Sequence, residues 1–167
     1  MSATIYAQDQ RPRAVGEVNE RRQKPLPSWV RLIREPDPAH PAPVLLRGPQ
    51  DVHALLHERA SGELGEVFYV ITLNTRSSVV GLHEVTRGTL TSSLVHPREV
   101  FLRAIADCAA GIIVAHNHPS GDPTPSPDDR TITTQLIEAG KVLDLPVYDH
   151  VVIGNGRYFS FAEGGLL

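Results

Sequence analysis

The sequence predicts an α/β (α+β) fold in a single domain. Apolar, β-branched stretches typical of strands alternate with stretches whose apolar residues recur at helical spacing. Prolines and glycines lie where these stretches begin and end. With 167 residues, 41% of them hydrophobic, the chain is long enough to enclose one hydrophobic core.

The first part of the chain differs from the rest in composition. Residues 1–45 are rich in Arg, Pro, Gln and Glu, and we expect an N-terminal arm that is partly disordered. Within it, residues 29–33 are apolar enough to add a strand to the domain or to a partner. The domain itself is expected over residues 46–167.

A helix and a strand hairpin are predicted next. Residues 49–60 have the helical pattern, and His53 and His57 share one of its faces, a spacing that fits a metal but is more typical of exposed histidines. Residues 66–74 form a nearly continuous apolar run, so this strand is expected to be central and covered on both faces. Residues 79–86 are its expected hairpin partner, with His83 and Glu84 as ordinary strand surface. Residues 88–95 are expected to form a polar loop or an edge strand.

The second half continues the alternation. Residues 97–110 predict a helix whose inner stripe holds five residues, namely Val100, Phe101, Ala104, Ile105 and Cys108. Residues 127–143 predict another helix, with four inward positions, namely Ile132, Leu136, Ala139 and Leu143. Strands are expected over residues 146–153 and 157–161, joined by a turn at Gly154-Asn155-Gly156.

Two histidines follow a short buried strand in the middle of the chain. Residues 111–115 are apolar, and an extended backbone continued to His118 places His116 and His118 on one face, because side chains alternate along a strand. Pro119 stops the hydrogen-bonding ladder, since it has no N–H. Turn-forming residues fill positions 120–125.

A helix start follows this loop. Ser126 suits the N-cap and Pro127 the first helical position. Asp129 then has two interpretations, as a carboxylate that caps the helix or as a third metal ligand beside the histidines. Two imidazoles and one carboxylate leave a fourth position open for water, which is typical of catalytic zinc sites. Such a site needs a general base, for which Glu66 is the candidate and Glu63 the alternative.

These residues resemble a known signature. His116-x-His118-Pro119, with seven residues between His118 and Ser126 and then x-x-Asp129, resembles the JAMM motif of the JAB/MPN metalloprotease superfamily. The stretch HNHPSGDPTPSPDDR is most similar to the bacterial RadC-like branch, as are EVFYVITLN, GTLTSSLVHPREVF and DHVVIGNGRYFSFAEGGLL. The resemblance spans residues 50–167 and implies the cytidine-deaminase-like JAB/MPN fold, a mixed central β-sheet flanked by helices.

The resemblance also implies a chemistry. His116, His118 and Asp129 would bind Zn²⁺, Glu66 would activate a zinc-bound water, and Ser126 would hydrogen-bond the developing oxyanion. The implied function is a zinc-dependent metallopeptidase or isopeptidase that acts on an extended segment of a peptide or protein. Asp149 is a candidate acceptor for the outer N–H of a ligating histidine, or else a structural partner of His150.

Two other functions stay open at this point. The first is a DNA-repair-associated accessory protein, and the second is a binding module with a vestigial metal site. Longer RadC-like proteins carry a helix-hairpin-helix-type segment, and we expect this chain to be a short form without it. Residues 1–40 carry seven basic and five acidic residues (+2), which leaves nine basic and 14 acidic (−5) for the remainder. This balance gives nucleic-acid binding weak support.

The compartment follows from three observations. No apolar run approaches the roughly 18–20 residues of a membrane span, and the first residues lack the layout of a signal peptide. The single cysteine, Cys108, excludes an internal disulfide. We therefore expect a cytoplasmic protein without membrane contact.

Overall fold

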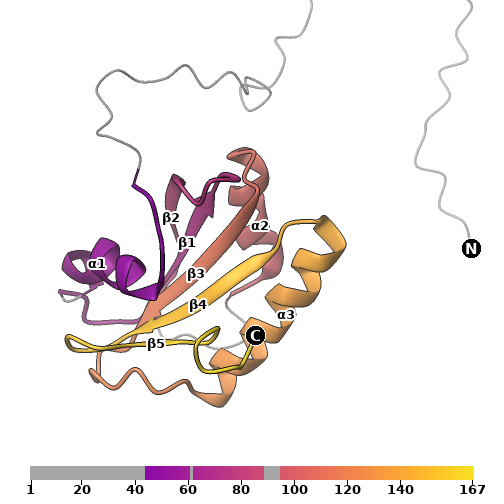
Figure 1. Cartoon of the computed structure of the whole chain (residues 1–167). Coiled ribbons are helices and arrows are strands. Elements are labelled where there is room, and N and C mark those ends of the chain that lie inside the picture. Colours follow the sequence, from indigo (N-terminus) through magenta and orange to yellow (C-terminus); the bar gives the residue numbers. More distant parts are fainter. Residues whose placement is uncertain (1–43, 61, 89–94) are drawn as a thin grey trace, which may run out of the picture. The chain divides into compact units, whose positions relative to one another are not determined.

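The computed structural model describes residues 44–60, 62–88 and 95–167. Within these residues lie eight elements: α1 (Pro49–Ala60), β1 (Val67–Leu73), β2 (Val79–Arg87), α2 (Pro97–Ala106), β3 (Gly111–Asn117), α3 (Pro127–Leu143), β4 (Val147–Ile153) and β5 (Tyr158–Ser160) (Figure 1). The predicted arm lies outside the described residues except for positions 44 and 45. Most of the predicted polar segment at 88–95 lies outside them as well.

The described strands form one mixed sheet in the order β2-β1-β3-β4-β5. β1 is antiparallel to both β2 and β3, β3 and β4 are parallel, and β5 returns antiparallel to β4. The parallel pair is joined through α3, because parallel neighbours need a long crossover connection. The predicted α+β fold with a mixed, helix-flanked sheet is confirmed.

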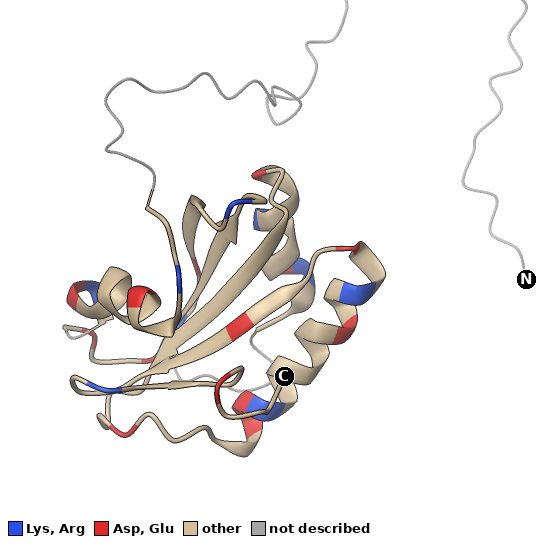
Figure 2. Ribbon diagram, in the orientation of Figure 1, with Lys and Arg blue, Asp and Glu red and all other residues tan. Residues whose placement is uncertain are grey.

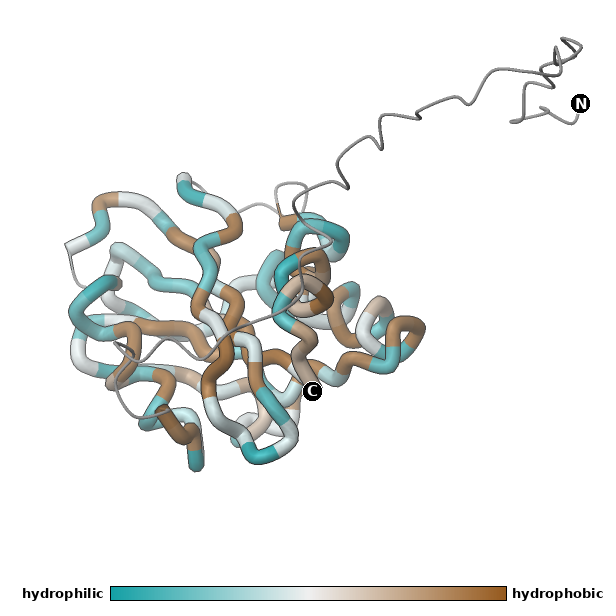
Figure 3. The backbone as a smooth tube through the Cα atoms, turned by 90° about the horizontal axis from the view of Figure 1, so that it is seen from above, coloured by the Kyte–Doolittle hydropathy of each residue, from teal (hydrophilic) through white to brown (hydrophobic). Residues whose placement is uncertain are grey.

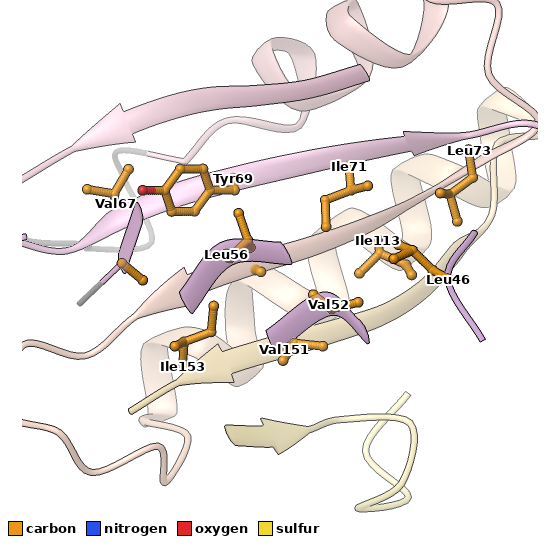
Figure 4. Close-up of a cluster of buried hydrophobic side chains, with 12 residues drawn as sticks. Leu46, Val52, Leu56, Val67, Tyr69, Ile71, Leu73, Ile113, Val151 and Ile153 are labelled. Carbon is orange, nitrogen blue, oxygen red and sulfur yellow. The ribbon is translucent and has the colours of Figure 1, made fainter. Parts of the chain in front are cut away.

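Helices cover both faces of this sheet. α1 packs on one face through a cluster that includes Val52 and Leu56 and is drawn in Figure 4. α2 and α3 supply Phe101 and Leu136 to a second cluster on the other face. Every residue of β1 and of β3 is buried, as the apolar runs at 66–74 and 111–115 predict. In Figure 3 hydrophobic stretches run through the interior and hydrophilic residues mark the outer turns.

The predicted inner stripe of α2 is wrong at its last two positions. α2 ends at Ala106, and Ile105 is 55% exposed. Cys108 is exposed as well, because it adopts a left-handed backbone (φ 52°) that lets Ala109 N–H bond to the carbonyl of Ala104 and close the helix. Helical spacing therefore overestimates the length of this helix.

The inward position predicted for Leu143 is also wrong. Asp144 is left-handed (φ 54°) and Leu145 N–H bonds to the carbonyl of Gly140, so that the last turn of α3 closes with Leu143 44% exposed.

None of the described helices combines the length and hydrophobicity that a membrane span requires.

Candidate metal centre

Three predicted ligands meet where β3 ends and α3 begins. His116 Nε2 lies 3.0 Å from His118 Nε2 and 3.1 Å from Asp129 Oδ1, and His118 Nε2 lies 3.5 Å from Asp129 Oδ2. His116 and Asp129 are buried, whereas the side chain of His118 is 13% exposed. We call these residues the metal cluster, because their ligand atoms all lie within 4.8 Å of one another and could hold a metal ion.

β3 places the two histidines. His116 stands opposite Phe68 of β1, and the two rings stack with centroids 6.1 Å apart. His118 follows the last strand residue, but its N–H still bonds to the carbonyl of Ile153, so the chain stays extended for one more step. The period-two alternation then carries His118 to the same face as His116.

Asp129 fulfils its predicted cap role and also faces the histidines. Its Oδ2 accepts hydrogen bonds from the N–H and the hydroxyl of Ser126, both at 2.7 Å, while Oδ1 faces His116. Ser126 Oγ in turn accepts from Asp129 N–H at 3.1 Å, which completes a capping box. The two interpretations of Asp129 are therefore compatible.

The carboxyl group of Asp129 is held in its charged form. Burial by itself would raise its pKa, but the imidazole groups of His116 and His118 beside it outweigh burial and hold the pKa well below its usual range. The contact between His118 and Asp129 also acts on the histidine, because the hydrogen bond to Asp129 raises the pKa of His118.

Glu66 directly precedes β1 and lies near the exposed side of the cluster. The pairing of β1 with β3 ends at Phe68 opposite His116, and Glu66 lies two residues before Phe68 as His118 lies two residues after His116. Its charge contributes to the raised pKa of His118. Glu63, the alternative base, is instead ion-paired with Arg87.

Asn117, between the two histidines, was not singled out from the sequence. Its side chain points to the opposite face, where Oδ1 accepts from Val67 N–H at 2.8 Å and Nδ2 donates to the carbonyl of Gly65 at 3.1 Å. These bonds hold the backbone on both sides of Glu66. The alternation along β3 is the signal that could have revealed this role.

The outer nitrogens of both histidines are engaged. His118 Nδ1 lies 2.7 Å from the carbonyl of Asp122, and His116 Nδ1 lies 2.8 Å from His150 Nε2. His150 is fully buried, and burial, followed by the nearby His116, lowers its pKa well below the usual value. Sequence reasoning missed this contact of His150.

Of the two interpretations given for Asp149, the structure supports the structural one, as a partner of His150. It accepts from His150 N–H at 2.7 Å, from the hydroxyl of Ser160 at 2.6 Å and from Ala162 N–H at 3.0 Å. It therefore braces the start of β4 against the C-terminal turn. The residue that contacts a candidate ligand is its neighbour His150.

A cavity of about 270 Å³ opens beside His118. His57 of α1 and Glu63 line it together with residues 117–121 and 153–155.

The histidine pair of α1 lies outside the metal cluster. The ring of His53 packs against those of His57 and Tyr158, with centroids 5.1 and 5.7 Å away. Within residues 44–60, 62–88 and 95–167, the metal cluster is the group of His, Cys, Asp and Glu side chains arranged for a metal, and neither His53 nor His57 belongs to it.

The fold and the cluster together define an α+β domain with a site able to hold a metal ion. A family model described as "RadC-like JAB domain" matches residues 46–166. The chain belongs to this family of RadC-like JAB domains, as its resemblance to the JAMM motif indicates.

The chain is also similar to curated proteins named UPF0758. The chain is 52% identical over 122 residues to a UPF0758 protein of Symbiobacterium thermophilum, a match that covers 73% of this chain and 52% of the relative. It is 49% identical to a UPF0758 protein of Moorella thermoacetica (74% and 54% covered) and 42% identical to one of Methanosarcina acetivorans (71% and 52%). The chain thus spans about half the length of the curated relatives it matches.

Proposed function

We propose that this protein is a zinc-dependent hydrolase of peptide or isopeptide bonds. The observation that carries the proposal is the metal cluster, in which two imidazole nitrogens and a carboxylate oxygen converge. His116 and Asp129 lie in the protein interior, while His118 borders a cavity. The cluster is thus shielded on one side and accessible on the other, as a catalytic site requires.

The donor set favours zinc in its catalytic form. Two His and one carboxylate leave one position open, whereas structural zinc sites have four protein ligands. Bound zinc supplies Lewis-acid chemistry, because it polarises a carbonyl group and makes water more acidic. His116, His118 and Asp129 would hold the ion.

Glu66 is the proposed general base. Both histidines use their Nδ1 atoms in hydrogen bonds and their Nε2 atoms in the cluster, so neither is available to accept the proton of water. Glu66 accepts this proton and passes it to the leaving nitrogen. The carbonyl carbon gains a bond to the water oxygen and loses its bond to nitrogen, which gives a carboxylic acid and an amine.

Ser126 is proposed to donate a hydrogen bond to the developing oxyanion. Its hydroxyl donates to Asp129 in this structure. Rotation about one side-chain bond redirects it, and Asp129 keeps its bond from the N–H of Ser126. The helix cap therefore survives the turn of the hydroxyl.

The proposed substrate is an extended peptide or protein segment. The cavity beside His118 offers space for a residue next to the cleaved bond, and its lining is polar, with Glu63 and His57 on one side. A nucleic-acid backbone would instead select a basic face. Over the described residues, Figure 2 shows basic positions scattered among acidic ones on several elements.

The test compares two glutamates. Full-length wild type, Glu66→Gln and Glu63→Gln are assayed for zinc content and for cleavage of fluorogenic peptides and of lysine-linked isopeptides. All three should contain about one zinc per chain. Glu66→Gln should lose about 10²- to 10⁴-fold in rate, the usual contribution of a general base. Glu63→Gln should lose far less than Glu66→Gln, because the carboxylate of Glu63 is paired with Arg87 and only lines the cavity.

Two results would overturn the proposal. One is a folded wild type that takes up no zinc. The other is full activity in both Glu66→Gln and Glu63→Gln. A rate loss confined to Glu63→Gln would move the base to Glu63 and reject the role of Glu66.

A further inference from the structure

A chain of hydrogen bonds runs from the metal cluster into the core and returns to it. His116 Nδ1 lies 2.8 Å from His150 Nε2, and His150 Nδ1 lies 2.6 Å from Thr133 Oγ1. Thr133 Oγ1 lies 2.6 Å from the backbone carbonyl oxygen of Asp129. All four residues are buried, so water does not compete for these contacts.

The direction of this chain is set at Thr133. The carbonyl oxygen of Asp129 carries no hydrogen, so the Thr133 hydroxyl must donate across the 2.6 Å contact. Two oxygen atoms at so short a distance, with no hydrogen between them, would repel each other. A hydroxyl has a single hydrogen, and Thr133 therefore acts as the acceptor towards His150. His150 must carry its hydrogen on Nδ1.

This assignment passes on to His116. With the hydrogen on Nδ1, a neutral His150 ring has a lone pair on Nε2 and accepts a hydrogen bond there. His116 must then carry its own hydrogen on Nδ1 and donate it. The second nitrogen of His116, Nε2, is left with a lone pair that faces His118 and Asp129.

We propose that Thr133 and His150 are positioning residues, which fix the tautomer of His116 so that its Nε2 lone pair is ready for the metal. The proposal rests on the zinc site proposed above. His118 donates Nδ1–H to the carbonyl of Asp122, so a second hydrogen on this ring lies on Nε2, from which a metal must displace it. Outer partners of ligating histidines tune metal affinity in this way.

The first test measures zinc affinity by competition with a chromophoric chelator. Thr133→Val keeps the shape but loses the hydroxyl, so His150 loses its acceptor and can carry its hydrogen on Nε2. His116 would then hold its hydrogen on the nitrogen that faces the metal. Zinc affinity should fall about 10- to 100-fold, the usual effect of losing an outer partner.

Two variants separate this effect from a general effect on α3. Thr133→Ser keeps the hydroxyl and should restore affinity. Thr134→Val removes a comparable bond, from Thr134 Oγ1 to the carbonyl of Arg130 at 3.0 Å, but this threonine is exposed and should leave zinc binding unchanged. Thermal unfolding shows whether each variant is folded.

The second test needs no metal. Nitrogen NMR of the imidazole rings in zinc-free protein, at a pH about two units above the usual histidine pKa of ~6.5, shows which nitrogen carries the hydrogen. His150 should carry it on Nδ1 in wild type and Thr133→Ser, and on Nε2 in Thr133→Val.

Each outcome decides a separate question. Equal zinc affinity in Thr133→Val and wild type, or a wild-type His150 with its hydrogen on Nε2, would overturn the role of Thr133 and His150. An equal loss in Thr134→Val would also overturn it. A wild type that binds no zinc overturns the proposed function instead, and the NMR result still decides the direction of the hydrogen bonds.

Discussion

Two regions of the sheet bring a histidine against an aspartate, with different consequences. One is the metal cluster. The other, the Asp107 cluster, consists of Thr72, His83 and Asp107 at the far end of β1. There His83 Nε2 and Thr72 Oγ1 both lie 2.6 Å from Asp107 Oδ2. The distance between histidine and carboxylate is thus shorter there than in the metal cluster, where it is 3.1 and 3.5 Å.

The difference lies in where the hydrogens are. In the Asp107 cluster a hydroxyl and a ring N–H donate to one carboxylate oxygen, so donors and acceptor are matched without an ion. In the metal cluster both histidines engage Nδ1 elsewhere, with His150 and with the carbonyl of Asp122, and their Nε2 atoms converge on Asp129. A short contact between His and Asp does not by itself mark a candidate metal site, and the outer hydrogen bonds of the two histidines are what distinguish the metal cluster from the Asp107 cluster.

The sharpest test of this comparison replaces one aspartate at a time. Asp129→Asn should lower zinc affinity by more than about 100-fold, because it changes a ligand and losing an outer partner already costs about 10- to 100-fold. Asp107→Asn should leave zinc affinity unchanged. Chelator competition on the full-length variants measures both, with circular dichroism as the check on folding. An equal loss in Asp107→Asn would remove the distinction between the clusters.

The pH dependence of zinc binding gives a second test. The hydrogen bond to Asp129 raises the pKa of His118, so this ring retains a proton above the usual range in the metal-free protein. Zinc must displace that proton. Affinity should therefore fall by about tenfold for each pH unit as the pH drops below the pKa of His118, and level off above it.

The control for this pH profile is a variant of the Asp107 cluster. Asp107→Asn leaves His118 and its partners intact and should give the same profile as wild type. A profile that is flat between about pH 6 and 8, around the ordinary histidine pKa, would contradict the displacement of a proton from His118.

The features that sequence reasoning identified are local ones. The alternation of a strand predicts that His116 and His118 share a face, and the order Ser126-Pro127 predicts the start of α3. The apolar run at 66–74 predicts a central strand. Each of these depends on neighbours within a few residues, which the sequence displays directly.

The features that it missed depend on partners far along the chain. His150 reaches His116 because the parallel register sets it opposite Val114, 36 residues earlier in the sequence, and no local pattern contains that register. Asp107 likewise meets His83 only after α2 has packed on the sheet. The α2 stripe fails for a related reason, since the left-handed turn at Cys108 is a choice of helix end that spacing does not show.

The smallest expected effect concerns the packing of the Asp107 cluster. A Cβ added at Gly81 would lie too close to Asp107 Oδ2, and would come within 3.0 Å of Thr72 Oγ1. Gly81→Ala should therefore lower the free energy of unfolding by about 1–3 kcal/mol, the usual range for an overpacked site. Gly62→Ala is the matched control, because nothing lies within 4 Å of its added Cβ. Urea unfolding of the zinc-free proteins measures both, and zinc affinity should match wild type in each.

Equal stability of the two variants would show that the side chains of the Asp107 cluster can move aside for the added Cβ at no cost in free energy. A loss of zinc binding in Gly81→Ala would show that the Asp107 cluster and the metal cluster are coupled.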